Sequence, residues 1–333
     1  MTQSDYEVTL NEERSEIREE QHGSVAHEPH GAKKERFVKN VRKYYKAYLF
    51  LLPLFFFLLM FSYFPAISGI YHSFFDWKDT GESIFIGFDN YVRFLFGEES
   101  QIFWDSCLTM LTIMLPKLLI NIFVPFVVAE LIFNLRKEKA KSFYRLWILI
   151  PMVAPGVVTT LIWQYIYDPN NGLVTALYML FGGTPIDWLN DEATVIPAII
   201  FMGFPWIGGT NVLIYLSGLN SISPEARESA RLDGAGTFRI IWSIDVPLVL
   251  EQFRFFLING LISGIQDYSV QFLLTNGGPG YKTMVPGYFM YEKAFTDGEM
   301  GYASAIGTFL FIVIMILTLI SFRIGKKKEG DIL

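Results

Sequence analysis

Residues 223–247 read SPEARESARLDGAGTFRIIWSIDVP and form the longest polar interruption between hydrophobic segments in the C-terminal half of the chain. Ser223 is a favourable helix N-cap, and Pro224 suits the first helical position, where a missing N–H costs nothing. Glu225 and Glu228 follow, near the positive end of the helix dipole. The pattern therefore predicts a helix that begins at Pro224.

Two glycines predict where this helix ends. Gly234 and Gly236 tolerate the left-handed conformation that closes many helices, and a second short helix is predicted from Thr237 toward Pro247. The first helix then has about ten residues and a length of roughly 15 Å. Isolated helices of this length are marginal in water, so another surface is expected to hold this one.

One face of the predicted helix suits contact with another protein. Ala226 and Ala230, four residues apart, give a strip of small side chains that allows close approach. Three carboxylates beside the strip can accept hydrogen bonds from cationic side chains: Glu225, Glu228 and Asp233. An ordinary amphipathic loop helix with solvated charges accounts for the same spacing equally well. The spacing alone does not distinguish this alternative from a helix that contacts another protein.

The composition places the chain in a membrane. Hydrophobic residues make up 52% of it, aromatic residues 17% and charged residues only 18%. Six segments have the roughly 20 apolar residues that a helix needs to cross the hydrocarbon core. They are residues 47–70, 107–133, 146–167, 193–219, 247–274 and 302–322. We therefore predict an all-α integral membrane protein with six transmembrane helices, in which the 223–247 segment joins the fourth and fifth.

The distribution of Lys and Arg predicts the orientation of these helices, because basic residues concentrate in cytoplasmic loops. Basic residues cluster before the first span, between the second and third, within residues 223–247 and after the last span, whereas residues 168–192 contain none. Both termini and the 223–247 segment are predicted to be cytoplasmic. The predicted parts are a flexible tail (1–32), a basic juxtamembrane segment (33–46), a six-helix membrane domain (47–325, with the polar loop at 220–247) and a C-terminal tail (326–333).

The remaining polar features give little chemistry. The formal net charge of −6 reflects acidic residues in the N-terminal tail and the outer loops. His22, His27 and His30 fall in the tail, where they lack a rigid scaffold or Cys partners, and no metal site is predicted. The single cysteine, Cys107, excludes an intrachain disulfide. The first span is no cleaved signal peptide, because it follows a long charged stretch.

Enzyme motifs are missing from the sequence. The closest approach to a phosphate-binding loop is GGPGYKT at residues 277–283, but Tyr281 separates Gly280 from Lys282, so no Gly-Lys-Thr sequence forms. Asn276 to Pro279 are better interpreted as the turn that ends the fifth span. A membrane chain with a cytoplasmic loop helix and no catalytic constellation is best interpreted as a transport pathway that another protein energises.

At this point several motifs resemble a known family, the permease subunits of ATP-binding-cassette (ABC) importers. The loop motifs are Glu228-Ser229-Ala230, Asp233-Gly234-Ala235 and Ile244 to Pro247, which resemble the EAA loop of these subunits. Further motifs resemble the carbohydrate branch: FDNY at 88–91, LLTNGGP at 273–279 and GYASA at 301–305. The resemblance covers roughly residues 45–323. Ser229 departs from the usual alanine, but serine is nearly isosteric.

The resemblance implies a mechanism and a set of partners. Two homologous permease subunits form the pore, two cytoplasmic ATPase subunits each hold one loop helix, and an extracytoplasmic solute-binding protein delivers a sugar or oligosaccharide. Glu228 pairs with a basic residue of the ATPase. ATP and Mg²⁺ are bound there, so no cofactor is expected in this chain. The implied coupling residues are Glu225, Glu228, Ser229, Ala230, Asp233, Gly234 and Gly236.

The resemblance also implies a substrate pathway. Gln266 and Asp267 lie in the outer half of the fifth span, where maltose-type subunits place sugar-binding side chains. Trp206, which follows Gly203 in the fourth span, could give the aromatic platform that a sugar ring needs, or could equally pack beside a proline kink. Other matching positions are apolar, namely Met152, Ile199 and Phe201. They leave open that a second permease subunit makes most sugar contacts.

Charged residues also occur inside the spans, where a charge is costly. Glu251 and Arg254, three residues apart, are predicted to form a local ion pair, and Lys117 and Glu130 to make packing or partner-subunit contacts. Two further classes of protein fit the same charges. An ion-coupled secondary transporter or channel could use Lys117, Glu251, Arg254 and Asp267, although the two halves show no internal repeat. A structural scaffold that only anchors the loop is a third possibility.

Overall fold

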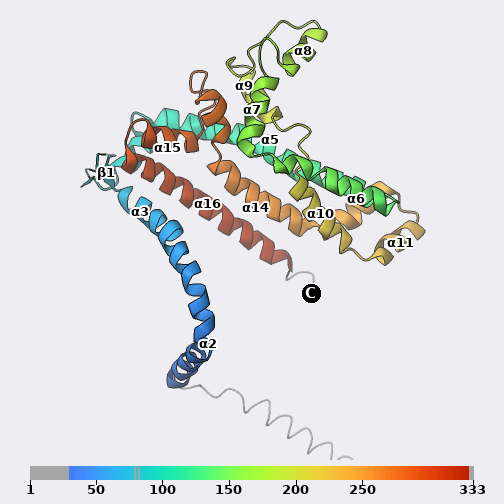
Figure 1. Cartoon of the computed structure of the whole chain (residues 1–333), viewed down its shortest axis with the longest axis horizontal. Coiled ribbons are helices and arrows are strands. Elements are labelled where there is room, and N and C mark those ends of the chain that lie inside the picture. Colours follow the sequence, from blue (N-terminus) through green and yellow to red (C-terminus); the bar gives the residue numbers. More distant parts are fainter. Residues whose placement is uncertain (1–29, 79, 82, 330–333) are drawn as a thin grey trace, which may run out of the picture. The chain divides into compact units, whose positions relative to one another are not determined.

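The structure, a computed structural model, describes residues 30–329 except positions 79 and 82. The chain divides into two compact units, residues 1–66 and 67–333, and each is described by itself (Figure 1). The predictions for residues 1–29, which include His22 and His27, and for residues 330–333 lie outside the described part.

The described part of the first unit, from residue 30 onward, is helical. Helix α2 (His30–Leu58) bends at Tyr44, whose backbone is non-helical, and continues into a π-helical turn, η1 (Leu59–Tyr63), and the start of α3 (Phe64–His72). Tyr48–His72 is long and apolar enough to cross a membrane. The apolar helix predicted for the first span is therefore present.

The second unit contains a small two-stranded sheet and the remaining helices. Their bounds, with 3₁₀ and π turns labelled η, are β1 (Phe75–Trp77), β2 (Ser83–Phe85), α4 (Asp89–Phe96), α5 (Ser100–Phe133), α6 (Glu138–Trp147), η2 (Ile150–Val153), α7 (Gly156–Ile166), α8 (Leu173–Leu180), α9 (Val195–Phe201), α10 (Gly209–Asn220), α11 (Pro224–Leu232), α12 (Thr237–Ile240), η3 (Ile241–Asp245), α13 (Val246–Leu248), α14 (Leu250–Gln266), η4 (Gln271–Thr275), α15 (Pro286–Phe295) and α16 (Met300–Glu329).

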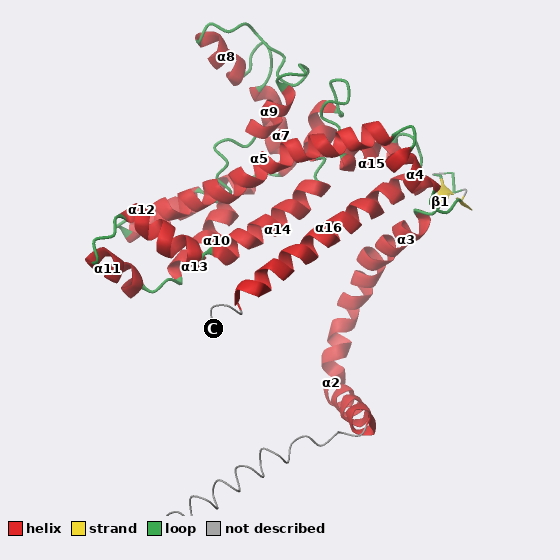
Figure 2. Ribbon diagram, turned by 180° about the vertical axis from the view of Figure 1, so that it is seen from behind, coloured by secondary structure: helices red, strands yellow, loops and turns green. Residues whose placement is uncertain are grey.

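Helix α5 organises the second unit. It is about 51 Å long at 1.5 Å per residue, and α4, α9, α10, α14 and α15 all pack against it. Figure 2 shows α14 lying between α5 and α16. One buried cluster, which includes Phe94, Phe103 and Ile306, joins α4, α5, α15 and α16. A second, around Phe126 and Tyr215, joins α5 to α10 and α14.

Charged side chains join the α4 end of this unit. Arg93 lies 2.8 Å from Glu99 and 2.9 Å from Glu299, and Lys293 lies 3.0 Å from Glu99 and 2.9 Å from Asp297. Burial opposes the ionisation of Glu99. The neighbouring Tyr302, Lys293 and Arg93 outweigh this effect and hold the pKa of the Glu99 carboxyl below its ordinary value. The network ties α4, the start of α5 and α15 to the start of α16.

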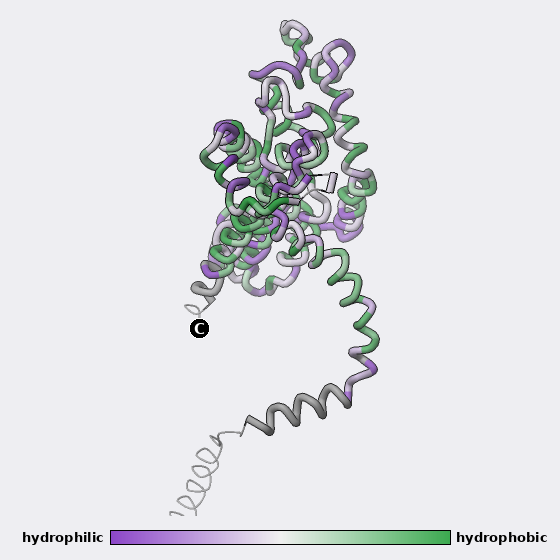
Figure 3. The backbone as a smooth tube through the Cα atoms, turned by 90° about the vertical axis from the view of Figure 1, so that its left-hand side faces the viewer, coloured by the Kyte–Doolittle hydropathy of each residue, from purple (hydrophilic) through white to green (hydrophobic). Residues whose placement is uncertain are grey.

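Within the described residues, three helical stretches are long and apolar enough to span a membrane on their own. Besides Tyr48–His72 they are Ser100–Phe133 and Met300–Arg323, which contain the second and sixth predicted spans. Hydrophobic residues predominate along Tyr48–His72 (Figure 3). The third and fifth predicted spans correspond to bent helix pairs, Glu138–Val153 with Gly156–Ile166 at 87°, and Thr237–Leu248 with Leu250–Thr275 at 64°. Each bent pair counts as one membrane span only if both of its helices belong to the same span.

The fourth predicted span, residues 193–219, is not one continuous helix. The structure breaks it into α9 and α10, separated by residues 202–208. Gly203 adopts a left-handed φ of 93°, and Pro205 has no N–H to donate to a helical hydrogen bond. Hydropathy does not register either effect, and the count of six spans stays a prediction.

Candidate functional site

Helix α11 forms where the sequence predicts it, from Pro224 to Leu232. Its cap differs from the prediction. The Ser223 hydroxyl donates to the carboxylate of Glu225 and makes no hydrogen bond to a backbone N–H of the helix. A carboxylate two residues away is a stronger acceptor for the hydroxyl and draws it from the capping role.

The end of α11 follows one of the two predicted glycines. Gly234 has a φ of 83°, and the N–H of Ala235 donates to the carbonyl of Ala230 at 2.9 Å. This bond closes the last turn of the helix. The prediction for Gly236 is wrong, because its φ is −68° and it precedes α12 in an extended conformation. The second short helix is present as α12, η3 and α13, from Thr237 to Leu248.

A single buried side chain, Arg227, fixes α11 to the membrane helices. Its Nη2 donates to Oδ2 of Asp245 at 3.0 Å and to Oδ1 of Asn134 at 3.2 Å. The guanidinium also lies 4.6 Å from the centroid of the Phe133 ring. Asp245 is 0% exposed and belongs to η3. The short helix is therefore held at the C-terminal end of α5, as its marginal length required.

Glu130 extends this contact into α5. It is 5% exposed, and its Oε2 accepts a hydrogen bond of 3.0 Å from the Asn134 amide, the same side chain that contacts Arg227. We call Glu130, Asn134, Arg227 and Asp245 the Arg227 anchor. The sequence prediction for Glu130, packing or a partner-subunit contact, missed this group. The available signal was a carboxylate in an otherwise apolar segment.

The other face of α11 is open. Most of the predicted coupling residues are exposed, namely Glu225, Glu228, Ser229, Asp233, Gly234 and Gly236, whereas Ala230 is half-buried. The structure thus brings these residues together on one outward surface, opposite the anchor. Their role in coupling stays a prediction.

Large apolar side chains are exposed on α11 and on the segment that follows it, and the sequence prediction missed them. Leu232 is 90% exposed, Phe238 78% and Trp242 63%. The rings of Phe238 and Trp242 stack with centroids 6.3 Å apart. Exposed apolar groups beside carboxylates are typical of a contact surface for another protein. Their spacing at 238 and 242, four residues apart in a polar segment, was the signal.

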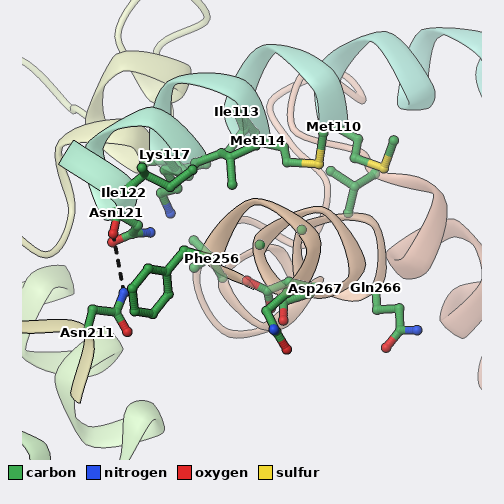
Figure 4. A pocket seen from close by; sticks show the side chains of 18 of the residues that line it. Met110, Ile113, Met114, Lys117, Asn121, Ile122, Asn211, Phe256, Gln266 and Asp267 are labelled. Carbon is green, nitrogen blue, oxygen red and sulfur yellow. Dashed lines mark hydrogen bonds between the residues drawn. The ribbon is translucent and has the colours of Figure 1, made fainter. Parts of the chain in front are cut away.

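A cavity of about 810 Å³ opens between α5, α10 and α14 (Figure 4). Its polar lining includes Lys117, Asn121, Thr210, Asn211, Asn259, Ser263, Gln266, Asp267 and Gln271. Its apolar lining includes Met110, Ile113, Met114, Ile122, Ile199 and Phe256. Amides and hydroxyls among apolar walls suit a ligand that has both hydroxyl groups and apolar ring faces.

The structure separates the predicted pathway residues into two groups. Gln266 and Asp267 line the cavity, at the end of α14 (Figure 4). Trp206 and Gly203 are absent from its lining, and the Trp206 ring packs edge-on against Phe201 and Phe204 with centroids 5.5 and 5.0 Å apart. The packing alternative for Trp206 matches this geometry. Whether any of these residues contacts a substrate stays a prediction.

The predicted ion pair between Glu251 and Arg254 does not form, although the structure describes both residues. Glu251 is exposed in the first turn of α14, where the helix dipole stabilises a carboxylate without a cationic partner. Lys117, predicted to make packing or partner-subunit contacts, extends into the cavity (Figure 4), and a contact with a partner subunit stays a prediction.

Comparison with known proteins identifies the family. Residues 121–328 match the family described as binding-protein-dependent transport system inner membrane component. The probable ABC transporter permease protein YurN of Bacillus subtilis is 30% identical over 287 residues, which cover 84% of this chain and 97% of YurN. The multiple sugar-binding transport system permease protein MsmF of Streptococcus mutans is 28% identical and covers 88% of this chain and 99% of MsmF.

Solved structures share the fold. A bacterial ABC transporter that imports the acidic polysaccharide alginate contains a chain with a TM-score of 0.75 and 23% identity, and the match covers 88% of this chain and 99% of that one. The alginate transporter in complex with an alginate pentasaccharide-bound periplasmic protein gives a TM-score of 0.77 at 22% identity and covers 88% and 98% of the two chains.

These matches confirm the predicted fold class, an all-α membrane protein, and the resemblance to ABC importer permeases. They leave the six-span count and the role of each site residue as predictions. The chain belongs to the binding-protein-dependent transport system inner membrane components, which are the permease components of ABC transporters rather than enzymes.

Proposed function

We propose that this chain is one of two permease subunits of an ATP-driven importer that moves a sugar or oligosaccharide inward across the cytoplasmic membrane. The observation that supports it most is the outward surface of α11, with its carboxylates and apolar side chains, held to α5 by one buried arginine. The sugar cargo is supported by relatives such as MsmF, whose name is that of a multiple sugar-binding transport system permease.

The partners follow from this role. A cytoplasmic ATPase dimer binds ATP and Mg²⁺, and each of its subunits receives one α11 helix from one permease subunit. The second permease subunit completes the pore. An extracytoplasmic solute-binding protein delivers the sugar, as the periplasmic protein in the alginate transporter complex suggests by analogy. The alternation of basic and non-basic loops supports six spans with both termini in the cytoplasm.

Each coupling residue has a proposed task. Glu228 pairs with a basic side chain of the ATPase, and Glu225 and Asp233 flank it as further acceptors. Ser229 and Ala230 let the ATPase surface approach closely. Gly234, in its left-handed conformation, sets the angle at which the chain leaves α11, and Gly236 is the N-cap of the next helix.

The cavity is the proposed sugar pathway through this subunit. Gln266 and Asp267 accept hydrogen bonds from sugar hydroxyls at one end of it, and the Gln266 amide also donates to them. Trp206 and Gly203 support the pathway indirectly, through the aromatic cluster between α9 and α10.

Transport by proteoliposomes that contain the whole complex tests the proposal. We expect sugar uptake that requires ATP on the ATPase side and that falls by at least about tenfold in Glu228→Lys, because a reversed charge repels its basic partner. Gly234→Pro should uncouple ATP hydrolysis from uptake. Glu98→Lys, the same substitution at an exposed position at the other end of α5, is the matched control.

Two outcomes would overturn the proposal. Unimpaired ATP-driven uptake in both variants would remove the coupling role of α11. Uptake that requires a proton or sodium gradient and no ATP would assign the chain to the ion-coupled transporters instead.

A further inference from the structure

Lys117 is a cation in an unusual place. It lies near the middle of α5, a helix that is long and apolar enough to span the membrane. Among the residues that line the cavity, all of them described, Lys117 is the only Lys or Arg and Asp267 the only Asp or Glu. A charged side chain at such a depth is costly and is retained mainly where it has a function.

The protein gives Lys117 no partner within the part of the chain that the structure describes. Its amine takes part in none of the hydrogen bonds or ion pairs there, and the Asp267 carboxylate does not come within the 4.0 Å of an ion pair. Asp267 already has a local partner, because its Oδ1 accepts the N–H of Ser269 at 3.0 Å. Lys117 therefore keeps its three donors for a group that enters the cavity.

Neutral polar groups line the same cavity as this amine. Asn121 lies one turn along α5 from Lys117, and the Asn211 amide donates to the Asn121 carbonyl at 3.3 Å (Figure 4). From α14, Asn259 and Ser263 lie four residues apart, on the same face, and also line the cavity. Amides and hydroxyls suit sugar hydroxyl groups, whereas the ammonium group favours a negative charge.

We propose that the cavity accepts saccharides that carry a negative group, a carboxylate or a phosphate, and that Lys117 binds this group. The inference rests on the proposed function and narrows its substrate class. The separation of the two charges also orients the ligand. The acidic group lies at Lys117, and uncharged hydroxyls lie toward Gln266 and Asp267.

Charge-selective labelling tests whether Lys117 makes the cavity attractive to anions. The complex is prepared with Cys107→Ser, which removes the only native thiol of this chain, and with Asn259→Cys, which places one thiol in the cavity. We compare the rates at which this thiol reacts with anionic sulfonatoethyl methanethiosulfonate and with cationic trimethylammonioethyl methanethiosulfonate. Each rate is divided by the rate at which the same reagent reacts with a small free thiol in solution. We expect Lys117 to raise the anion-to-cation ratio about tenfold relative to Lys117→Gln.

The controls keep this test decisive. Lys117→Arg preserves the positive charge and should preserve the anion-to-cation ratio. The outcome therefore does not depend on Lys117→Gln alone, which could lose its fold. An equal ratio in Lys117 and Lys117→Gln would overturn the proposal. Neutralisation of Lys117 by a carboxylate of the second permease subunit would also give an equal ratio, and it would overturn the proposal as well.

A saccharide arm identifies the anionic group. Trigalacturonate, its fully methyl-esterified form and glucose 1-phosphate are each added before labelling of the introduced thiol. We expect the carboxylate or the phosphate to slow labelling, the ester not to, and the difference to vanish in Lys117→Gln. Equal slowing by acid and ester, or slowing by none of the three, would overturn the proposal. ATP-driven uptake of a neutral sugar without charge selectivity would refute this inference alone, whereas absent ATP-driven uptake would refute the proposed function.

Discussion

Arg227 shows what single residues contribute to this protein. Its guanidinium contacts Phe133 and Asn134 at the end of α5 and Asp245 of η3, so one side chain joins two segments that are distant in sequence. The sequence identified Arg227 only as a cytoplasmic charge and Glu130 only as an intramembrane carboxylate. Asp245 appeared only as part of the Ile244 to Pro247 motif, without a partner. Pairing them requires the fold, because nothing in their local spacing relates them.

Removal of the Arg227 charge should destabilise the protein more than removal of an exposed charge. In Arg227→Met the buried Asp245 carboxylate loses its partner, at a cost of about 3 kcal/mol. The double variant Arg227→Met with Asp245→Leu should recover most of this loss, because no unpaired buried charge remains at position 245. Thermal unfolding of the purified protein in detergent measures both. Arg239→Met, at an exposed arginine of α12, is the control, and an equal loss in both single variants would contradict the stabilising role of the Arg227 anchor.

Glu99 predicts a pH dependence at the α4 end. Its folded pKa lies below its ordinary value near 4.5, so its contribution to stability is present above that pH and is lost as the pH falls through the lower, folded pKa. Glu99→Gln should therefore lower the unfolding temperature at neutral pH, and the difference from the native protein should shrink below pH 4.5. Glu98→Gln, the exposed neighbour, should show no such convergence. Parallel curves for the Glu99 variant would contradict the prediction.

At the scale of elements, local sequence patterns predicted that a helix is present better than they predicted whether it is unbroken. Apolar runs identified the spans Tyr48–His72, α5 and α16, and turn chemistry identified the start and end of α11. The bends and breaks were missed. The fourth run divides at Gly203 and Pro205, and the fifth bends at Val249, where the backbone leaves the helical region. A hydropathy average cannot detect such positions, because a break in a helix changes the backbone geometry but not the amino-acid composition of the segment.

The two glycines after α11 give a matched test of backbone geometry. A Cβ at either position would meet no atom within 4 Å, but only Gly234 has a positive φ, of 83°. Gly234→Ala should cost about 1 kcal/mol through left-handed strain, whereas Gly236→Ala, at an ordinary φ, should be neutral or slightly stabilising. Thermal unfolding of both variants and their ATP-driven uptake provide the measurement. Equal effects would show that conformation at Gly234 is not the cause.

At the scale of the whole molecule, composition and motifs predicted the class of protein, its membrane location and its family. The cavity could not be predicted, because its walls come from α5, α10 and α14, and their relative positions depend on packing. Small residues set some of that packing. Gly260 and Gly264 face Leu118 and Met114 of α5, where an added Cβ would lie 2.3 and 2.4 Å from their side chains. The sequence shows where these glycines are but does not show which side chains pack against them.

One glycine contact joins distant parts of the second unit. A Cβ on Gly301 at the start of α16 would lie 2.1 Å from the carbonyl oxygen of Phe75 in β1, which is backbone and cannot move aside cheaply. Gly301→Ala should therefore reduce the yield of folded protein severely, as judged by gel filtration after detergent extraction. Gly307→Ala, which meets only the flexible Met290 side chain at 3.0 Å, should be tolerated. Normal yield of the Gly301 variant would contradict the close packing of α16 on β1.

The π-helical turn η3 (Ile241–Asp245) has a consequence for comparing this chain with its relatives. A π turn takes in one residue more than an α turn and returns to the same helical register afterwards. A relative with a regular α-helix at this point would therefore need one residue fewer to place its next helix identically. A one-residue gap opposite residues 241–245 in an alignment would mark a change in helix type, with the flanking helices still equivalent.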